Sequence, residues 1–172
     1  MDTIAISVRR AIAADAPALT ALVNEAFAVE RDFVEGDRAT VAEIAAMTRD
    51  GVFLVLEAAG GLAAAIHVER RGEGAAFGLL AVRPALQGLG LGERMVRIAE
   101  AMAEATGAGS ISLRIVNLRE DLGRWYRGLG YREVGTTPCA DPRTTQPCHF
   151  VEMHKALGAG GASASHGAHA SA

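Results

Sequence analysis

The sequence has few cysteines and no excess of positive charge. Only Cys139 and Cys148 occur among its 172 residues, and the formal net charge is -3. Two cysteines are too few to build a disulfide framework, which favours a reducing compartment. Without an excess of lysine and arginine, the chain lacks the electrostatic footprint that nucleic-acid binding requires. A disulfide scaffold is therefore excluded, and no nucleic-acid partner is expected.

Long apolar runs are also missing. Residues 1–6 contain neither the basic segment nor the long apolar segment of a secretory signal. The apolar run at 62–66 is far too short to span a bilayer, which takes about 20 residues. We therefore expect no membrane partner and a cytoplasmic location.

What the chain does contain suits one globular domain. Its length and its 50% hydrophobic share are ordinary for a single core. We place this domain at 1–157. Residues 158–172 are only Gly, Ala, Ser and the histidines His166 and His169. Because this tail has nothing to bury, we expect it to be disordered, and its histidines to be solvated rather than bound to a metal.

Apolar periodicity predicts an alternation of strands and helices. Strands are expected at 4–8, 52–56, 62–68, 75–82, 111–115, 131–134 and 150–153. Helices are expected from 15 to 26, from 40 to 50, from 91 to 102 and from 118 to 129, with a charged loop at 29–38. Thr40 and Glu43 form a capping-box pattern at the second helix. The order predicts an α+β fold around one central mixed sheet.

A glycine-rich segment, 82–92, lies between an apolar strand and an amphipathic helix. Glycines let backbone N–H groups approach a ligand, and the first turn of a helix leaves such groups free to bind an anion. Glu93 stands where a P-loop needs a lysine and where a dinucleotide fingerprint needs its third glycine. Both of those sites are therefore excluded, while a purely structural turn stays open.

The motifs resemble those of the GNAT superfamily of acyl-CoA-dependent N-acyltransferases. Gln87-x-x-Gly90-x-Gly92 is similar to that family's pyrophosphate-binding motif, and 125–131, with Asn117 at a preceding strand end, is similar to its second motif. The resemblance implies a single-domain GNAT-like fold. Its central sheet is mostly antiparallel, with about seven strands flanked by helices and two splayed central strands.

The same resemblance implies acetyl-CoA as cosubstrate. It places the pyrophosphate on the amides of 87–92, the pantetheine arm along the strand that ends at Val82, and the thioester near Asn117 and Tyr126. The implied contact residues are Leu80, Ala81, Val82, Gln87, Gly88, Leu89, Gly90, Leu91, Gly92, Asn117 and Tyr126. Asn117 also suits a plain turn at a strand end.

Transfer to an amine needs a neutral nitrogen and a proton for the departing thiolate. A lysine-like amine has a pKa about three units above neutrality, so its deprotonation accounts for roughly 4 kcal/mol. Tyr126 matches the family's acid, although a tyrosine in a helix can equally be a core residue. Trp125 lies on the apolar stripe and is expected in the core.

No acidic residue or histidine occurs at 77–82, where many relatives carry a base. His67 and Glu69 share one face of the neighbouring strand and are candidate catalytic groups, or else a surface pair. Glu30, Asp32 and Glu35 lie in the loop at 29–38. The resemblance implies that this loop lines the acceptor pocket, while a solvated loop is the alternative. Cys148 and His149 are too sparse for a metal site, and no metal is expected.

The sequence therefore predicts an acetyl-CoA-dependent N-acetyltransferase. A primary amine would attack the thioester directly in a ternary complex, with no covalent intermediate on the enzyme. Two alternatives stay open, a catalytically weak acyl-CoA-binding regulatory module and an interaction domain whose glycine loop is structural. The identity of the acceptor and the oligomeric state, including a homodimer, are also open.

Overall fold

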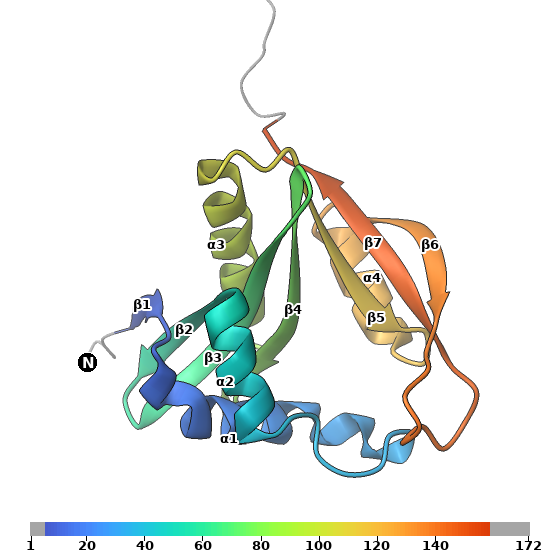
Figure 1. Cartoon of the computed structure of the whole chain (residues 1–172), viewed down its shortest axis with the longest axis horizontal. Coiled ribbons are helices and arrows are strands. Elements are labelled where there is room, and N and C mark those ends of the chain that lie inside the picture. The colour runs from blue at the N-terminus through green and yellow to red at the C-terminus, as the bar shows by residue number, and fades with distance from the viewer. Residues whose placement is uncertain (1–5, 159–172) are drawn as a thin grey trace, which may run out of the picture.

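The protein folds around one seven-stranded sheet in the order β1-β2-β3-β4-β5-β7-β6 (Figure 1). The computed structural model describes residues 6–158. The strands are β1 (Ser7–Arg10), β2 (Val52–Ala58), β3 (Gly61–Arg71), β4 (Gly74–Val82), β5 (Ser110–Val116), β6 (Arg132–Pro138) and β7 (His149–Ala156). Neighbouring strands are antiparallel except β4 and β5. The α+β fold with a mostly antiparallel mixed sheet is thus confirmed.

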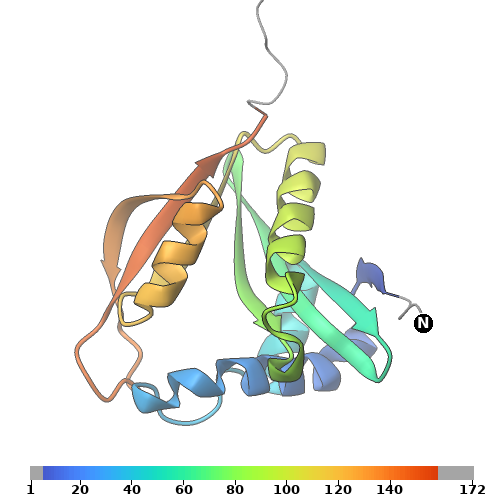
Figure 2. The ribbon, with the colours of Figure 1, turned by 180° about the vertical axis from the view of Figure 1, so that it is seen from behind.

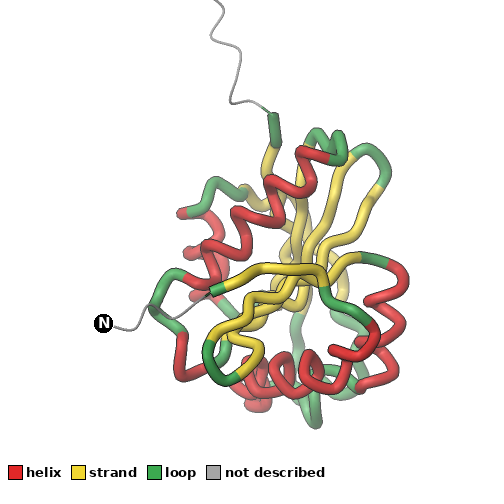
Figure 3. Tube along the Cα trace, turned by 90° about the vertical axis from the view of Figure 1, so that its left-hand side faces the viewer, coloured by secondary structure: helices red, strands yellow, loops and turns green. Residues whose placement is uncertain are grey.

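Helices cover both faces of the sheet. One face carries α1 (Ala16–Ala26) and α2 (Val41–Asp50), and the other, seen from behind in Figure 2, carries α3 (Leu91–Ala105) and α4 (Glu120–Gly128). The period of two in β2 explains this division. Phe53 and Val55 join the core under α1 and α2, whereas Leu54 and Leu56 join the core under α3. Figure 3 shows the two helical layers edge-on.

The predicted elements all occur, with two local differences. The first strand, expected at 4–8, is described as Ser7–Arg10. The expected loop at 29–38 begins as a 3-10 helix, η2 (Phe27–Asp32), which continues directly from α1. The capping box of α2 is present, since Thr40 Oγ1 accepts the Glu43 N–H at 3.2 Å and Glu43 Oε2 accepts the Thr40 N–H at 2.7 Å. Ile4 of the first predicted strand and the predicted disordered tail beyond 158 lie outside the described residues. No helix at 6–158 combines the length and apolarity needed to cross a bilayer.

The two central strands diverge, as the resemblance implied. β4 and β5 pair only at Ala75 with Ile111 and at Ala76 with Ser112, and Figure 1 shows them separating below this point. β4 also carries one extra residue against β3, because His67 pairs with Gly78 while Ala65 pairs with Ala81. Within this bulge Leu79 has φ 46°, a left-handed backbone that costs a non-glycine residue of order 1–3 kcal/mol. The bulge thus bends β4 away from β5.

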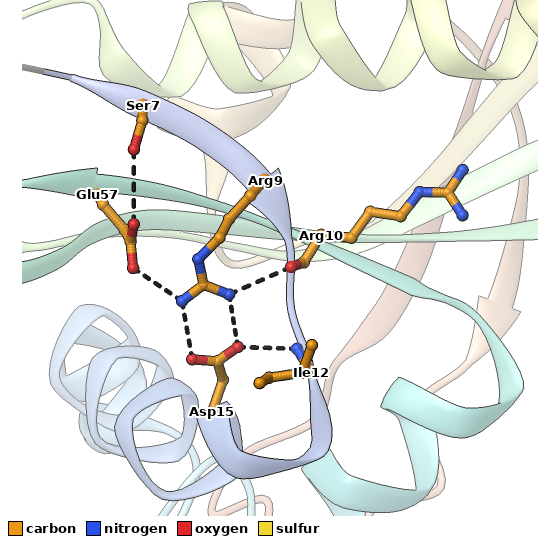
Figure 4. Close-up of polar contacts among 6 residues, drawn as sticks. All are labelled: Ser7, Arg9, Arg10, Ile12, Asp15 and Glu57. Carbon is orange, nitrogen blue, oxygen red and sulfur yellow. Dashed lines mark hydrogen bonds and ion pairs between the residues drawn. The ribbon is translucent and has the colours of Figure 1, made fainter.

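Polar networks hold the edge strand β1 and the end of the sheet where β4 and β5 pair. Arg9 of β1 donates to both oxygens of Asp15 at 2.7 and 2.9 Å and to Glu57 of β2 at 2.7 Å, which ties the edge strand to the start of α1 (Figure 4). The Arg9 guanidinium lowers the pKa of Asp15. At the paired end of β4 and β5, buried Glu100 of α3 accepts from the Tyr131 hydroxyl at 2.8 Å and from Lys155 at 2.9 Å.

Candidate active site

Two cavities meet between the diverging strands. The first, of about 410 Å³, is lined from η2, β3, β4, β5, α4 and the start of β7, and we call it the β4–β5 cavity. The second, of about 480 Å³, is lined by residues 26–27, the end of β4, residues 86–88 and 90–93, and the start of α4, and we call it the glycine-loop cavity. Phe27, Leu80 and Leu122 line both. The cavities therefore adjoin at these three side chains, which we call the junction.

The glycine-loop cavity ends on the first turn of α3. Gly90 caps this helix with φ 78° and no side-chain cap, and the first intrahelical bond runs from the Arg94 N–H to the Gly90 carbonyl at 3.0 Å. The N–H groups of 91–93 therefore have no partner within the helix. Gly88 also has φ 78°, and at both glycines the space where a Cβ would stand is open. The turn presents backbone donors and a helix dipole to an anion.

Most of the predicted cofactor contacts line this cavity. They are Leu80, Val82, Gln87, Gly88, Gly90, Leu91 and Gly92. Ala81 and Leu89 do not line it. Ala81 is buried in the core beneath α1 and α2, and Leu89 is 68% exposed. The alternation of β4 directs Ala81 to the opposite face from Leu80 and Val82.

Asn117 is the strand-end turn residue of its two predicted roles, and Trp125 is a core residue as predicted. Asn117 lines neither cavity; its Oδ1 accepts the His149 N–H at 2.8 Å, and its own N–H donates to the His149 carbonyl at 2.9 Å. It thereby joins the end of β5 to β7. Trp125 packs against the apolar core but also lines the glycine-loop cavity beside Gly92.

Tyr126 lies in the β4–β5 cavity, on α4. Its side chain is only 5% exposed, and its ring packs against Phe77 and Trp125 with centroids 5.9 and 4.8 Å away. Residues 6–158 provide no hydrogen bond to its hydroxyl. Burial raises the pKa of Tyr126 above its ordinary value, opposed by the positive charge of Arg119. The phenol therefore stays protonated and can act as a donor.

Glu30 also lines the β4–β5 cavity, and the neighbouring acids Asp32 and Glu35 do not. Glu30 is 8% exposed, and burial raises its pKa against the opposing charges of Arg38 and Arg119. Arg119, which precedes α4, lies 3.6 Å from the Glu30 carboxylate and lines the glycine-loop cavity. Arg119 thus connects a buried acid in one cavity with the other cavity.

His67 and Glu69 do share the β4–β5 cavity, as their spacing predicts. His67 is 4% exposed, and its Nε2 lies 3.0 Å from the Met47 carbonyl, so a neutral ring donates there and leaves Nδ1 as an acceptor. Burial lowers the pKa of His67, against the raising effect of that hydrogen bond. Glu69 forms an ion pair with Arg71, whose Nη2 and Nε lie 2.7 and 2.8 Å from the same oxygen, Oε1.

Two further arginines line the β4–β5 cavity and were not predicted. Arg38 stacks on Phe27 at 5.3 Å, and Arg114 stacks on Phe150 at 5.1 Å. Within the described chain, no carboxylate lies within 4.0 Å of either guanidinium. No sequence motif marks these residues, because the α1–α2 connection and β5 meet only in the folded chain.

Comparison with known proteins identifies this arrangement. A family model described as "Acetyltransferase (GNAT) domain" matches residues 49–133, from the end of α2 to the start of β6. The chain belongs to the GNAT superfamily. The matched segment of this GNAT domain contains the bulged strand, the glycine loop and Tyr126, whereas Glu30, Arg38 and Phe150 lie outside it. It indicates an acetyltransferase.

Solved structures of low sequence identity share the GNAT fold over nearly the whole chain. The ribosomal-protein-S18-alanine N-acetyltransferase from Escherichia coli is 17% identical, with a TM-score of 0.73 over 89% of this chain and 94% of the other. Ard1 from Thermoplasma volcanium is 16% identical, with a TM-score of 0.74 over 90% and 99%. The yncA protein from Salmonella typhimurium, solved with its cofactor acetyl-CoA, is 20% identical, with a TM-score of 0.71 over 89% and 94%. No protein with a curated description matches significantly.

Proposed function

We propose that this protein transfers an acetyl group from acetyl-CoA to a primary amine by direct attack in a ternary complex. The junction of the two cavities carries this proposal. A donor anchored on the glycine loop can reach the junction from one cavity, while an amine reaches it from the other. Tyr126 lines the amine's side of this meeting point.

The glycine loop and β4 supply the groups that would hold acetyl-CoA. The free amides of 91–93 and the loop before them suit a diphosphate. Beyond Ala76 the β4 backbone has no β5 partner, so its peptide groups can pair with the two amides of a pantetheine arm. Bound there, acetyl-CoA supplies an activated thioester, and the protein supplies orientation and proton transfer.

Tyr126 is the proposed acid, since a protonated, desolvated phenol can donate to a departing thiolate. Glu30 and His67 are the proposed bases. Burial moves the pKa of Glu30 toward neutral pH, and a general base works best when its pKa lies near the working pH. His67 offers a neutral imidazole instead. Glu69, held by Arg71, contributes charge rather than proton acceptance.

We also propose that the acceptor carries an acidic group beside its amine. Arg38 and Arg114 line the acceptor side, and no carboxylate of the described chain pairs with them. Guanidinium groups bind carboxylates through paired N–H donors, so these two residues suit an amino-acid-like acceptor.

A thiol-release assay with acetyl-CoA tests this function. The amine library should contain amino acids, their carboxamides, the corresponding decarboxylated amines, short peptides and polyamines. We expect turnover, with amino acids preferred over their carboxamides by at least about tenfold, which is roughly 1.4 kcal/mol. Arg38→Gln and Arg114→Gln should reduce that preference. Equal rates for amino acids and carboxamides would contradict the proposed acidic group on the acceptor but not acetyl transfer itself.

Binding without chemistry is the outcome that separates the alternatives. If acetyl-CoA raises the melting temperature but no amine is acetylated, the protein is an acyl-CoA-binding module. If acetyl-CoA causes no thermal shift, the glycine loop is structural and the proposal fails.

A further inference from the structure

The two cysteines of the chain face each other at the open end of a hairpin. In β6 and β7, Thr137 pairs with Phe150 and Pro138 with His149. One step further along the same register places Cys139 opposite Cys148. Directly opposed residues of antiparallel strands have Cα atoms about 4.5–5.5 Å apart, inside the roughly 4.4–6.8 Å range of disulfides.

The thiols are free, half-buried and close enough to influence each other. Both cysteines are of intermediate exposure. Loss of solvation and the neighbouring Cys139 thiol raise the pKa of Cys148. No third cysteine exists in the sequence to compete for either one. The pair is thus positioned for an intrachain bond rather than for exchange among several partners.

The loop between the cysteines forms part of the support for the β4–β5 cavity. Arg143 donates to the Asp37 carbonyl at 2.6 Å and accepts the Glu35 N–H at 2.9 Å, while the Thr145 N–H donates to the Phe33 carbonyl at 3.0 Å. Figure 1 shows this loop beside the chain that follows η2. Glu30 and Arg38, which flank the contacted segment 33–37, both line the cavity.

We propose that Cys139 and Cys148 form a reversible disulfide that locks the β6–β7 loop against residues 33–37 and so fixes one wall of the acceptor site. The oxidant would be a small-molecule disulfide. One cysteine thiolate attacks it, forming a mixed disulfide and releasing one thiol; the second cysteine thiolate then displaces the other thiol. Two protein thiols are oxidised, one small disulfide is reduced to two thiols, and the cysteine protons pass to them.

Oxidised glutathione, added to the full-length protein, tests the bond itself. We expect intact-mass analysis to show the loss of two hydrogens, the free thiols to fall from two to none, and dithiothreitol to reverse both changes. Cys139→Ser and Cys148→Ser should instead each take up one glutathione. Two stable glutathione adducts on the wild-type protein, or linkage between chains, would show that the thiols do not reach each other.

Hydrogen exchange and kinetics test the consequence. In the oxidised wild type, the Glu35 and Thr145 amides should exchange more slowly, and the melting temperature should rise by roughly 5 °C. Oxidation should change KM for the acceptor by about threefold or more and leave KM for acetyl-CoA unchanged. In the Cys139→Ser/Cys148→Ser double variant, oxidised glutathione should change none of these quantities. A disulfide that forms without slowing the exchange of these amides would refute the proposal that it locks the loop against residues 33–37.

The kinetic part rests on the proposed function, whereas mass, thiol count and hydrogen exchange do not. A protein without turnover would therefore fail the kinetic test and could still show the expected mass, thiol count and hydrogen exchange. Slower exchange with an unchanged acceptor KM would refute the effect on the acceptor site.

Discussion

At the scale of single residues, Tyr126 offers the sharpest test of mechanism. Its hydroxyl has no hydrogen-bond partner among residues 6–158, while its ring packs in the core. Tyr126→Phe keeps the ring and removes the proton, so kcat should fall by about 10²-fold while stability and KM for acetyl-CoA change little. Tyr126→Ala should also destabilise the fold by about 3–5 kcal/mol through a cavity. A phenylalanine variant with full kcat would remove Tyr126 from the chemistry.

Glu30 and His67, the two proposed bases, are distinguished by their variants. If Glu30 is the base, activity falls as pH drops through its raised pKa, and Glu30→Gln abolishes activity near neutrality. Because burial penalises the charged carboxyl, Glu30→Gln should raise stability at pH 7. If His67 is the base, His67→Gln carries the loss of activity instead. pH–rate profiles of both variants decide between them.

The pKa of His67 also predicts how stability depends on pH. The pKa of His67 is lower in the folded protein than in the unfolded chain, so the unfolded chain binds the proton more readily. Wild-type stability should therefore fall as pH drops below about 6.5, and His67→Gln should flatten that dependence. Denaturant unfolding at pH 5 and pH 8 measures it.

At the scale of elements, the turn into α3 is the part to test. Gly90→Val would place a branched side chain where the helix amides face the cavity, at φ 78°. At a hundredfold excess over Kd, acetyl-CoA should stabilise the wild type by about 2.7 kcal/mol, and most of this should vanish in the variant.

Gly72 provides the matched control. It has φ 57°, an equally open Cβ position and no place in either cavity. Gly72→Val should lower the melting temperature through the same backbone strain but keep the full shift with acetyl-CoA. Equal shifts in both variants would contradict binding at the glycine loop.

At the scale of the whole molecule, a sheet that opens at one end needs to be held at the other. The Glu100 carboxylate joins α3 to Tyr131 and Lys155 where β4 and β5 still pair. Glu100→Ala would leave the Tyr131 phenol without its acceptor and the largely buried Lys155 ammonium without its counter-ion, with only the Leu129 carbonyl at 2.8 Å. We therefore expect a loss of about 3 kcal/mol in the free energy of urea unfolding. Arg97→Ala, which removes an exposed pair with Glu93 at 3.2 Å and a longer pair with Glu100 at 3.8 Å, should cost less than about 1 kcal/mol.

Local pattern alone was enough to predict the order of elements, the α2 capping box and the glycine turn. These features depend on neighbours within a few residues, on side-chain period and on the backbone freedom of Gly90. The resemblance of two short motifs correctly predicted the superfamily and the diverging central strands. His67 and Glu69 were predicted to share a face because strand alternation is also local.

Only the tertiary structure decided which side chains meet in the cavities. Glu30, Arg38, Arg114 and Arg119 come from separate elements, and the opening of the sheet brings them together. It also turned Asn117 toward His149 and buried Ala81 beneath α1 and α2. The physical reason is that a bulge at Leu79 and a ladder that ends at Ala76 are properties of strand pairing, which joins residues far apart in the chain.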